Sequence, residues 1–494
     1  MSSTGVRAFA LSSYDVPHGH ELVVRSCEDC ACPTSGARST RPERTVHSGR
    51  PLVRSRDVLE MPLDSEHWVL FAPQGNGGVV VVNERGLDVF RQFRSPVAPR
   101  DLAGHDQEAV TQVVRRLAEQ DLVHEPGKPA VASFTESREL TAWLHVTNAC
   151  NLRCTYCYVH KSSDEMDTAL AKSSVDALVD SALRHGFRAL RLKYAGGEAS
   201  LNAAVLLELH DHAVARCAEH GLDLSAVVLS NGVALPPRFT RDLLQRSIRV
   251  MISLDSLGET HDAQRPTLGG KPSAHLVMRT IDQLIERGLP PHLSITITSG
   301  NTADIASVVR FALARDLTFS FNFFRDNACT GDASGLRYEQ EAMVDGVADA
   351  FAAIEEAMPP WSVLGSVLDR GQLVEPRRKA CGVGDDYVVI DQSGAISQCH
   401  MELGSPVGHV GADDPITAVR RPGIRNLLAE EKEGCRDCTW RNWCSGGCSV
   451  ATFRATGRFD VRSPNCGIYK AIYPAALRLE GLRVLRFAES GSPS

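Results

Sequence analysis

The spacing of apolar residues divides the chain into regions with different expected structures. Residues 68–71 and 79–82 are short apolar runs typical of strands, and the Gly-rich residues 73–78 between them predict a hairpin turn. Apolar side chains then recur at helical spacing, at Leu87, Phe90 and Phe93 and again at Val110, Val113, Val114 and Leu117. Residues 57–127 are therefore expected to form a small strand–strand–helix–helix unit.

A different pattern begins near residue 138, where strand-like apolar runs alternate with helix-like stretches as far as residue 358. This alternation is typical of β/α units around a parallel sheet. The expected strands are residues 141–147, 189–194, 226–229, 249–254, 292–298 and 318–324. Six such units predict the α/β class, with a partial (β/α)6, TIM-like barrel whose chemistry lies on the loops after the strands.

The two ends of the chain follow neither pattern. Residues 1–56 are rich in Ser, Arg, Pro and Gly, lack sustained periodicity and are expected to be a disordered arm. Cys27, Cys30 and Cys32 lie in this arm. A metal clamp and an unstructured extension are the two interpretations of these cysteines. Residues 471–494 are expected to form a C-terminal helix and tail.

Length and composition narrow the class of protein. A chain of 494 residues predicts about three domains. The net charge of −7 argues against nucleic acid as the main partner. No apolar run approaches the length of a membrane span, and the first residues lack a secretory signal. The 15 cysteines are therefore expected to be metal ligands in a reducing cytoplasm rather than disulfides.

Three of these cysteines lie in one short loop. Cys150, Cys154 and Cys157 have a Cys-x3-Cys-x2-Cys spacing directly after the first expected strand, and Tyr156 precedes the third cysteine. Three thiolates can hold a four-iron cluster and leave one iron open. A zinc knuckle is the alternative, but zinc sites usually take four ligands in paired spacings.

At this loop the chain resembles the radical S-adenosylmethionine (radical SAM) enzymes. The resemblance implies a [4Fe-4S] cluster whose open iron chelates the methionine part of S-adenosyl-L-methionine, and reductive cleavage to a 5′-deoxyadenosyl radical. It also implies that Tyr156 and the residues after the next strands contact this cofactor. Gly196, Gly197 and Glu198 follow the second strand and would bind the methionine amino group, although the family often has a proline where this chain has Ala199.

Further polar residues close the third and fourth expected strands. Ser230 and Asn231, and then Ser253 and Asp255, could reach the ribose hydroxyls of the cofactor. Arg265 resembles the family's arginine for the methionine carboxylate, a task that suits its planar guanidinium. Each residue alone could equally be a polar cap at a strand end.

A second cysteine system lies near the C-terminus. Cys381 and Cys399 frame Gly394, and a Cys-x2-Cys-x5-Cys-x3-Cys run and a final cysteine follow, at Cys435, Cys438, Cys444, Cys448 and Cys466. This pattern resembles the SPASM extension of radical SAM enzymes, which binds two auxiliary iron–sulfur clusters, and it would occupy residues 379–470. A pair of structural zinc sites is the alternative.

The resemblance implies how these cysteines are divided. Cys435, Cys438, Cys444 and Cys466 would surround one auxiliary [4Fe-4S] cluster, whereas Cys381, Cys399 and Cys448 would hold the other, nearer the active site. Seven thiolates are one short of eight, so the nearer cluster has an open iron or takes a further ligand. Cys329 and a substrate cysteine are both candidates, whereas Cys217 is expected to be a buried structural thiol.

The unit at residues 57–127 is similar to the winged-helix-like recognition element of peptide-modifying enzymes, which binds a leader by adding it as a strand. The resemblance thus implies a maturase that installs a thioether, a carbon–carbon crosslink or a related oxidation in a ribosomally made precursor peptide. An external electron donor such as flavodoxin or ferredoxin is a further expected partner, and neither nucleic acid nor a membrane is expected.

Three other functions stay open. The substrate could be a folded enzyme subunit of the sulfatase or dehydrogenase type, or a small metabolite that is dehydrogenated. A non-enzymatic iron–sulfur sensor with a DNA-binding winged helix is disfavoured by the acidic net charge. No catalytic acid or base is identified, although Arg325 and Asp326 follow the last expected strand and could face the substrate.

Overall fold

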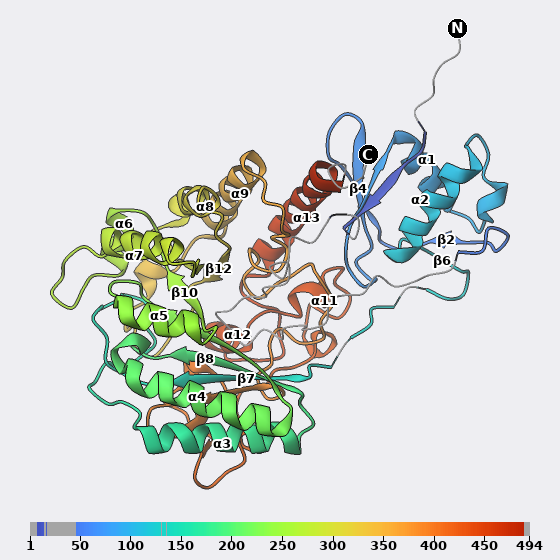
Figure 1. The fold of residues 1–494 in the computed structure, drawn as a ribbon. Helices are drawn as coiled ribbons and strands as arrows, with labels where there is room; N and C mark the ends of the chain where they lie inside the picture. The colour runs from blue at the N-terminus through green and yellow to red at the C-terminus, as the bar shows by residue number, and fades with distance from the viewer. Residues whose placement is uncertain (1–6, 14–15, 17–45, 130, 135, 489–494) are drawn as a thin grey trace.

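The computed structural model describes residues 7–13, 16, 46–129, 131–134 and 136–488 (Figure 1). A large α/β body is joined to a smaller unit formed by the N-terminal part of the chain, and the long C-terminal helix α13 (Cys466–Ala488) lies between them (Figure 1). Cys27, Cys30 and Cys32 fall outside the described residues. No helix in the described part of the chain is long and apolar enough to span a membrane.

The α/β body is organised around one sheet with the strand order β12-β11-β10-β9-β8-β7-β13-β14-β15. Its first six strands are parallel neighbours. They are β7 (Glu139–His145), β8 (Ala189–Ala195), β9 (Asp223–Ser230), β10 (Arg249–Ser253), β11 (His292–Ile297) and β12 (Phe319–Phe323). All six lie where the sequence predicts strands, so the α/β class and the partial barrel of six β/α units are confirmed.

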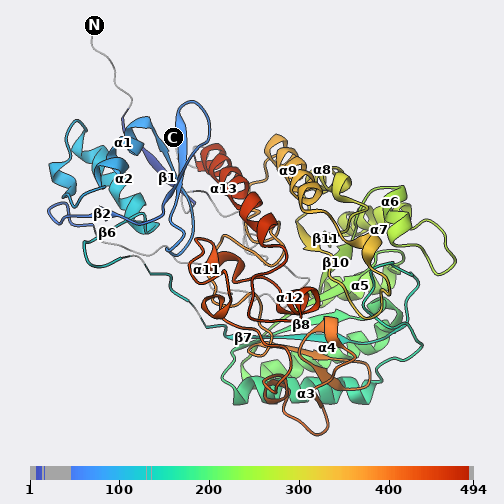
Figure 2. The ribbon, with the colours of Figure 1, turned by 180° about the vertical axis from the view of Figure 1, so that it is seen from behind.

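Helices follow these strands and cover the outer side of the sheet, while the chain that carries the second cysteine system lies on the inner side (Figure 2). They are α3 (Thr168–Arg184), α4 (Ala203–His220), α5 (Pro237–Gln245), α6 (Glu259–Gln264), α7 (Ala274–Glu286), α8 (Ile305–Leu313) and α9 (Gln340–Glu356). The buried faces of strands and helices merge into one hydrophobic core. Cys217 is buried in α4, as predicted.

The C-terminal region extends the same sheet. The strand β13 (Tyr387–Ile390) pairs in parallel with β7 on the side away from β8, and β14 (Ala395–Ser397) and β15 (Gly408–His409) follow antiparallel. The short helices α10 (Pro415–Val419), α11 (Arg441–Cys444) and α12 (Ser449–Thr456) come next. The first strand of the barrel is therefore flanked by a strand from the region with the second cysteine system.

The N-terminal unit contains a four-stranded sheet with the order β1-β5-β4-β3. Its elements are β1 (Ala10–Ser12), β3 (Leu59–Pro62), β4 (His67–Phe71), β5 (Val80–Asn83), α1 (Glu84–Gln92) and α2 (Gln107–Glu119). A two-stranded ribbon, β2 (Val53–Arg54) and β6 (Val123–His124), closes the unit. Along the whole described part of the chain there are also six short 3-10 helices: Pro99–Asp101, Ala199–Asn202, Thr302–Asp304, Ser334–Leu336, His400–Glu402 and Ala429–Glu431.

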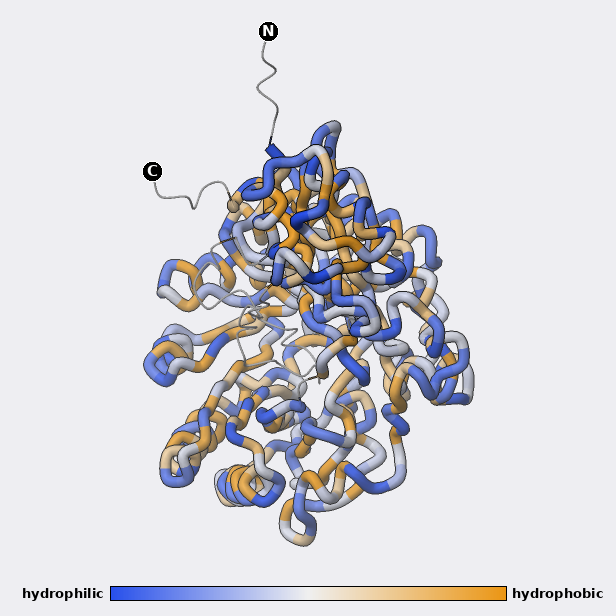
Figure 3. Tube along the Cα trace, turned by 90° about the vertical axis from the view of Figure 1, so that its right-hand side faces the viewer, coloured by the Kyte–Doolittle hydropathy of each residue, from blue (hydrophilic) through white to orange (hydrophobic). Residues whose placement is uncertain are grey.

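The alternation of side chains along its strands explains why the sheet of this unit is covered by α1 and α2 on one face and by α13 on the other. Val80 and Val82 of β5 pack into a core with α1 and α2, whereas Val81 belongs to the core that includes α13. Because successive residues of a strand face opposite sides, a fully apolar strand must be covered on both. Figure 3 shows the hydrophobic segments of this unit in its interior, with hydrophilic segments on its outer loops.

The predicted arm at residues 1–56 needs correction where the structure describes it. Residues Ala10–Ser12 form β1 and pair antiparallel with β5, and residues Val53–Arg54 form β2. A three-residue strand is too short to create a periodic apolar pattern, and for that reason the pattern does not predict it. The unit also has two strands, β1 and β3, that its apolar runs did not predict.

Candidate active site

A cavity of about 200 Å³ opens at the carboxyl ends of the barrel strands. Its wall is built from the cysteine loop after β7 and from the loops after β8, β9 and β10. The predicted site residues that line it are Cys150, Cys154, Tyr156, Cys157, Gly196, Gly197, Glu198, Ser230, Asn231, Ser253 and Arg265. The structure therefore brings together almost the whole predicted cofactor site.

Main-chain hydrogen bonds hold the cysteine loop in place. The N–H of Arg153 donates to Pro266 O at 2.8 Å, and the N–H of Thr155 donates to Gln264 O at 2.9 Å. The charges of Cys150 and Cys157 both raise the pKa of Cys154, which indicates that the three thiols are neighbours. Burial is the largest cause of that shift and raises the pKa of Cys154 to about 12.

The two glycines after β8 line the cavity and also contact the cysteine loop. The Gly197 N–H donates to Thr147 O at 2.7 Å, and the N–H of Glu198 donates to Ala149 O at 2.8 Å. A Cβ atom on Gly197 would lie 2.2 Å from Ala149 O, and one on Gly196 would lie 2.5 Å from Thr147 O. The Gly-Gly pair is thus needed because two backbone segments touch here.

Glu198 is buried with only 2% of its surface exposed, and the chain itself supplies most of its hydrogen bonds. Its Oε1 accepts from the hydroxyls of Ser200 and Ser230, and its Oε2 accepts from the Asn231 N–H at 2.7 Å. These donors orient the carboxylate at the cavity wall. Because Oε2 has one accepted bond in this network and a carboxylate oxygen can accept two, it can also receive a cationic amine.

Tyr156, Asp255 and Arg265 form a buried cluster beside the cysteines. The Tyr156 hydroxyl donates to Asp255 Oδ2 and accepts from Arg265 Nη1 at 2.6 Å, and Arg265 Nη1 lies 3.6 Å from the same carboxylate oxygen. Arg265 is 7% exposed, and its Nε has no hydrogen-bond partner among the described residues. Burial raises the pKa of Tyr156 well above its ordinary value, which keeps the hydroxyl protonated.

The prediction for Asp255 differs from its observed position. Its side chain is completely buried and does not line the cavity, because Oδ1 accepts from the Thr296 N–H and Oδ2 binds Tyr156. The prediction placed it against a ribose, whereas the structure places it behind Tyr156 and Arg265. Ser253, two residues earlier at the end of β10, does line the cavity.

Several cavity residues were not predicted. Trp143 of β7 stacks on His400 with ring centroids 4.4 Å apart, and both line the cavity together with Lys161 and Arg370. Burial and the charges of Arg370 and Arg325 lower the pKa of His400 well below its ordinary value. No local motif marks these residues, since they come together from distant parts of the chain.

The two residues that follow β12 have different positions. Arg325 lines the cavity and forms a buried ion pair with Asp369. Asp326 instead pairs with Arg337 at 2.6 Å and is absent from the cavity wall. Of the two open candidates, only Arg325 can therefore face a substrate in this cavity.

The second cysteine system separates into two groups in space. Burial is the largest cause that raises the pKa of Cys444, and the charges of Cys435, Cys438 and Cys466 raise this pKa further. In the other group, burial and the charges of Cys448 and Cys399 raise the pKa of Cys381. This grouping matches the division into sets of four and three that the family resemblance implies.

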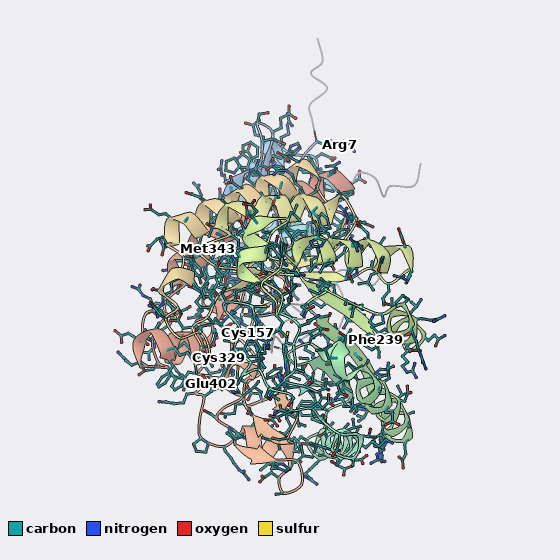
Figure 4. The ribbon with its side chains drawn as sticks, turned by 90° about the vertical axis from the view of Figure 1, so that its left-hand side faces the viewer. Arg7, Cys157, Phe239, Cys329, Met343 and Glu402 are labelled. Atoms are coloured by element: carbon teal, nitrogen blue, oxygen red, sulfur yellow. The ribbon has the colours of Figure 1, made fainter. Side chains whose placement is uncertain are left out.

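Cys329 does not lie with the group of three. In Figure 4, Cys329 lies near Cys157. Its thiol is 3.2 Å from Tyr158 O, and the charges that act on its pKa are those of Cys157, Lys161 and Arg454. None of these belongs to the group of Cys381, Cys399 and Cys448. The structure thus gives no support to Cys329 as a ligand of the nearer auxiliary cluster.

Lys432 tests whether the cysteine groups suit anionic clusters. Its side chain is 2% exposed, and its ammonium donates to Ser445 O at 3.2 Å. No carboxylate pairs with it among the residues that the structure describes, but its charged neighbours include Cys435 and Cys444 of one group and Cys381 and Cys448 of the other. A buried cation needs a counter-charge, and thiolate-ligated clusters on both sides would supply one.

The arrangement also bears on the zinc alternative. The described residues include no group of three or more His, Cys, Asp or Glu side chains spaced for a single metal ion. A structural zinc ion needs four ligands around one point at bond lengths of about 2.0–2.3 Å. Iron–sulfur clusters are larger, and their thiolates bind separate irons, so the cysteine groups fit clusters better than single ions.

Comparison with known proteins agrees with this geometry. Residues 144–312 match the sequence model of the Radical SAM superfamily. The sporulation killing factor maturation protein SkfB of Bacillus subtilis (strain 168) is 24% identical over 309 residues, which cover 60% of this chain and 68% of that protein. The antilisterial bacteriocin subtilosin biosynthesis protein AlbA of the same strain is 26% identical over 338 residues, covering 63% and 67%. Against an uncharacterized protein of Methanocaldococcus jannaschii, the match spans 57% of that relative's length.

A solved structure shares the fold. The structure of native anSMEcpe with bound AdoMet and the Cp18Cys peptide has a TM-score of 0.56 and 17% identity, and the alignment covers 72% of this chain and 100% of that one. The match to the superfamily model spans β7 to α8, and it contains the three-cysteine loop and the cavity residues from Gly196 to Arg265. Residues 144–312 of this chain are therefore part of a radical SAM domain.

Proposed function

We propose that the protein is a radical SAM peptide maturase, which installs a thioether or carbon–carbon crosslink, or a related oxidation, in a ribosomally made precursor peptide. The observation that carries this proposal is that one cavity is lined both by the three-cysteine loop and by residues beside the second cysteine system. Its wall includes the three-cysteine loop, and it also includes Arg370 and His400, which neighbour the group of Cys381, Cys399 and Cys448. The named roles of SkfB and AlbA in peptide maturation and biosynthesis support the substrate class.

The residues of the cavity have distinct proposed roles. Cys150, Cys154 and Cys157 would hold the [4Fe-4S] cluster, which together with S-adenosyl-L-methionine supplies a 5′-deoxyadenosyl radical. Glu198, held by Ser200, Ser230 and Asn231, would bind the methionine amino group. Arg265, whose Nε is unpaired in the described structure, would bind the methionine carboxylate.

The other side of the cavity would bind the substrate. Trp143 and His400 form a stacked aromatic wall, and Arg325 and Arg370 carry positive charge beside it. Because burial and both arginines disfavour a charged imidazole, His400 would be neutral and would take part in hydrogen bonds rather than act as a base. Water exclusion by this wall would protect a radical intermediate from side reactions.

The rest of the chain divides into proposed domains. Residues 57–127 would recognise the leader, residues 138–358 would form the radical SAM partial barrel, and residues 379–470 would bind two auxiliary [4Fe-4S] clusters. The group of Cys435, Cys438, Cys444 and Cys466 would hold one, and the group of Cys381, Cys399 and Cys448 the other. An external one-electron donor such as flavodoxin or ferredoxin would supply the electron for cleavage of the cofactor.

The proposal can be tested with the full chain, reconstituted with iron and sulfide under anaerobic conditions. Replacing Cys150, Cys154 and Cys157 together by Ala should remove about four irons per chain and abolish formation of 5′-deoxyadenosine. Cys217→Ala, which changes a buried thiol in α4, is the matched control and should keep both. If the triple variant still cleaved S-adenosyl-L-methionine, the assignment of the radical site would be wrong.

The substrate class needs a separate measurement. Precursor peptides encoded near the gene should lose hydrogen mass when incubated with the enzyme, and the same core peptides without leaders should react much more slowly. Equal modification of leaderless peptides would remove the recognition role from residues 57–127. Modification of a folded enzyme subunit or of a small metabolite, with no peptide modified, would replace the proposed function by one of the alternatives.

A further inference from the structure

The outer strand β1 of the N-terminal sheet has unusual contacts for so short an element. It pairs antiparallel with β5 through only three residues, with Ala10 opposite Val82, Leu11 opposite Val81 and Ser12 opposite Val80. The Ser13 N–H extends the ladder by donating to Val79 O at 3.1 Å. The segment therefore completes a sheet edge that β5 would otherwise expose.

Asn83, the last residue of β5, binds the main chain of this segment at its other end. Its Oδ1 accepts from the Phe9 N–H at 3.2 Å, and its Nδ2 donates to Arg7 O at 2.8 Å. The same Oδ1 caps α1 by accepting from the Gly86 N–H at 2.8 Å, which fixes the amide in this orientation. These contacts bind backbone groups only, so they would accept any extended segment without regard to its side chains.

Side-chain packing adds a simple pattern. Ala10 packs against the core with α1 and α2, and Leu11 packs against the core that includes α13. Gly86 permits the close approach of the segment's backbone on the first side, because a Cβ atom there would lie 2.5 Å from Phe9 O. The groove beside β5 thus accepts a small residue facing α1 and α2, followed by a leucine-sized residue facing α13.

The opposite edge of the sheet does not offer a similar groove. β3 ends with Pro62, which has no N–H to donate to an added strand. Glu60 on the same strand is paired with Arg54 at 2.9 Å and with Arg91 at 3.1 Å. Charged side chains and proline on an edge oppose the addition of another strand, so β5 carries the edge suited to a peptide.

We propose that the edge of β5 is a peptide-docking surface and that β1, from the protein's own N-terminal segment, is its intramolecular occupant. An extended peptide with a small residue and then a leucine-like residue would replace β1 by strand exchange. The hydrogen bonds lost and gained in this exchange are equivalent, so affinity would depend on competition with the tethered strand. That the displacing peptide is a leader of the substrate rests on the function proposed above.

Competition predicts a measurable difference in affinity. A segment tethered to its site acts at an effective concentration in the millimolar range for short linkers. The apparent affinity for a peptide in solution is the intrinsic affinity multiplied by the fraction of molecules in which the edge is free. Disabling β1 should therefore tighten the binding of an added peptide by about tenfold or more.

The test uses the full chain and a synthetic peptide with the sequence of residues 4–18, labelled with a fluorophore. The double variant Leu11→Asp/Ser13→Pro removes the apolar contact of β1 and its hydrogen bond to Val79. Fluorescence anisotropy should show at least about tenfold tighter binding of the peptide to this variant than to the unmodified protein. Arg7→Ala is the control, because it removes only an exposed ion pair with Asp106 and should leave the affinity unchanged.

Hydrogen exchange supplies the second measurement. The amides of β5 should be protected in the unmodified protein, lose protection in the double variant and regain it when the peptide is added. A peptide that itself carries Leu11→Asp and Ser13→Pro should restore nothing. Equal peptide affinity of variant and unmodified protein, or no peptide binding to a variant that remains folded by circular dichroism, would overturn the proposal.

Cleavage of S-adenosyl-L-methionine in the absence of substrate separates this proposal from the previous one. The double variant should keep the unmodified rate, since no residue of β1 lines the cavity. Peptide exchange in an enzyme that cannot cleave the cofactor would overturn the proposed function alone. Normal cleavage without any peptide exchange would overturn the docking surface alone.

Discussion

Replacing Gly197 by Ala tests whether the contact between the β8 loop and the cysteine loop is essential. The added Cβ would lie 2.2 Å from Ala149 O and 2.6 Å from Asn148 O, both backbone atoms, and real Cβ atoms essentially never come within 3.0 Å of another atom. Neither oxygen can move alone, because each belongs to the loop that carries Cys150. The two segments must therefore separate.

The cost of this separation follows from the bonds that join them. The hydrogen bonds from Gly197 N to Thr147 O and from Glu198 N to Ala149 O would weaken or break, and each contributes about 0.5–1.5 kcal/mol. Overpacking strain adds about 1–3 kcal/mol. About 1.4 kcal/mol corresponds to a factor of ten. A total near 3 kcal/mol therefore predicts that the conformation with both loops in contact is populated roughly 100-fold less than in the unmodified protein.

Affinity for S-adenosyl-L-methionine, measured by equilibrium dialysis on reconstituted protein, should therefore fall by about 30-fold or more in Gly197→Ala. Gly335→Ala is the matched control, because its added Cβ meets nothing within 4 Å, and it should change affinity by less than about twofold. The same affinity and iron content in Gly197→Ala as in the unmodified protein would refute the role assigned to this contact.

Two further predictions concern buried charges. Lys432→Met should lower the reduction potentials of the proposed auxiliary clusters by roughly 40–90 mV, since removing about 1–2 kcal/mol of charge stabilisation disfavours the reduced, more negative cluster; a redox titration followed by electron paramagnetic resonance would show this, and unchanged potentials, or an equal shift in the Lys128→Met control, whose side chain is exposed, would contradict it. Burial raises the pKa of Asp386 to about 7, above its unfolded value of about 3.9, so the folded state loses stability as the pH rises from about 4 to 7. Asp386→Asn should remove that loss, so its gain in free energy of unfolding over the unmodified protein should be larger at pH 8 than at pH 5, by about 2.5 kcal/mol, and its thermal midpoint should rise correspondingly more at pH 8; an equal difference at both pH values would contradict the shift.

Local signals made most of the fold predictable. Each barrel strand lies in a short, largely apolar run, and the structure places a parallel strand at all six positions. The cavity is predictable for the same reason, since the carboxyl ends of parallel strands meet at one edge of the sheet. Residues that immediately follow a strand, such as Glu198, Ser230 and Asn231, therefore lie at the cavity as expected.

The residues that sequence patterns missed come from long-range packing. Trp143 sits within β7 and His400 follows Cys399, yet their rings stack because β13 places the C-terminal region beside β7. Lys432 looks like an ordinary surface lysine in the sequence, and only the fold shows that it is 2% exposed between two cysteine groups. Neither a motif nor a period can express proximity of this kind.

Asp255 and Gly197 show a further limit of motifs. A motif does not tell whether a residue faces the cavity or supports the residues that do. Both stand at predicted site positions, and both were expected to touch the cofactor. Gly197 lines the cavity and also allows two loops to touch, whereas Asp255 lies behind Tyr156 and Arg265. Because removing Asp255 would leave a buried guanidinium and a buried hydroxyl without their shared acceptor, its loss should disturb Arg265 as strongly as a direct contact would. A motif thus identifies which positions the chemistry depends on, while the structure is needed to separate the side chains that face the cavity from those that hold them.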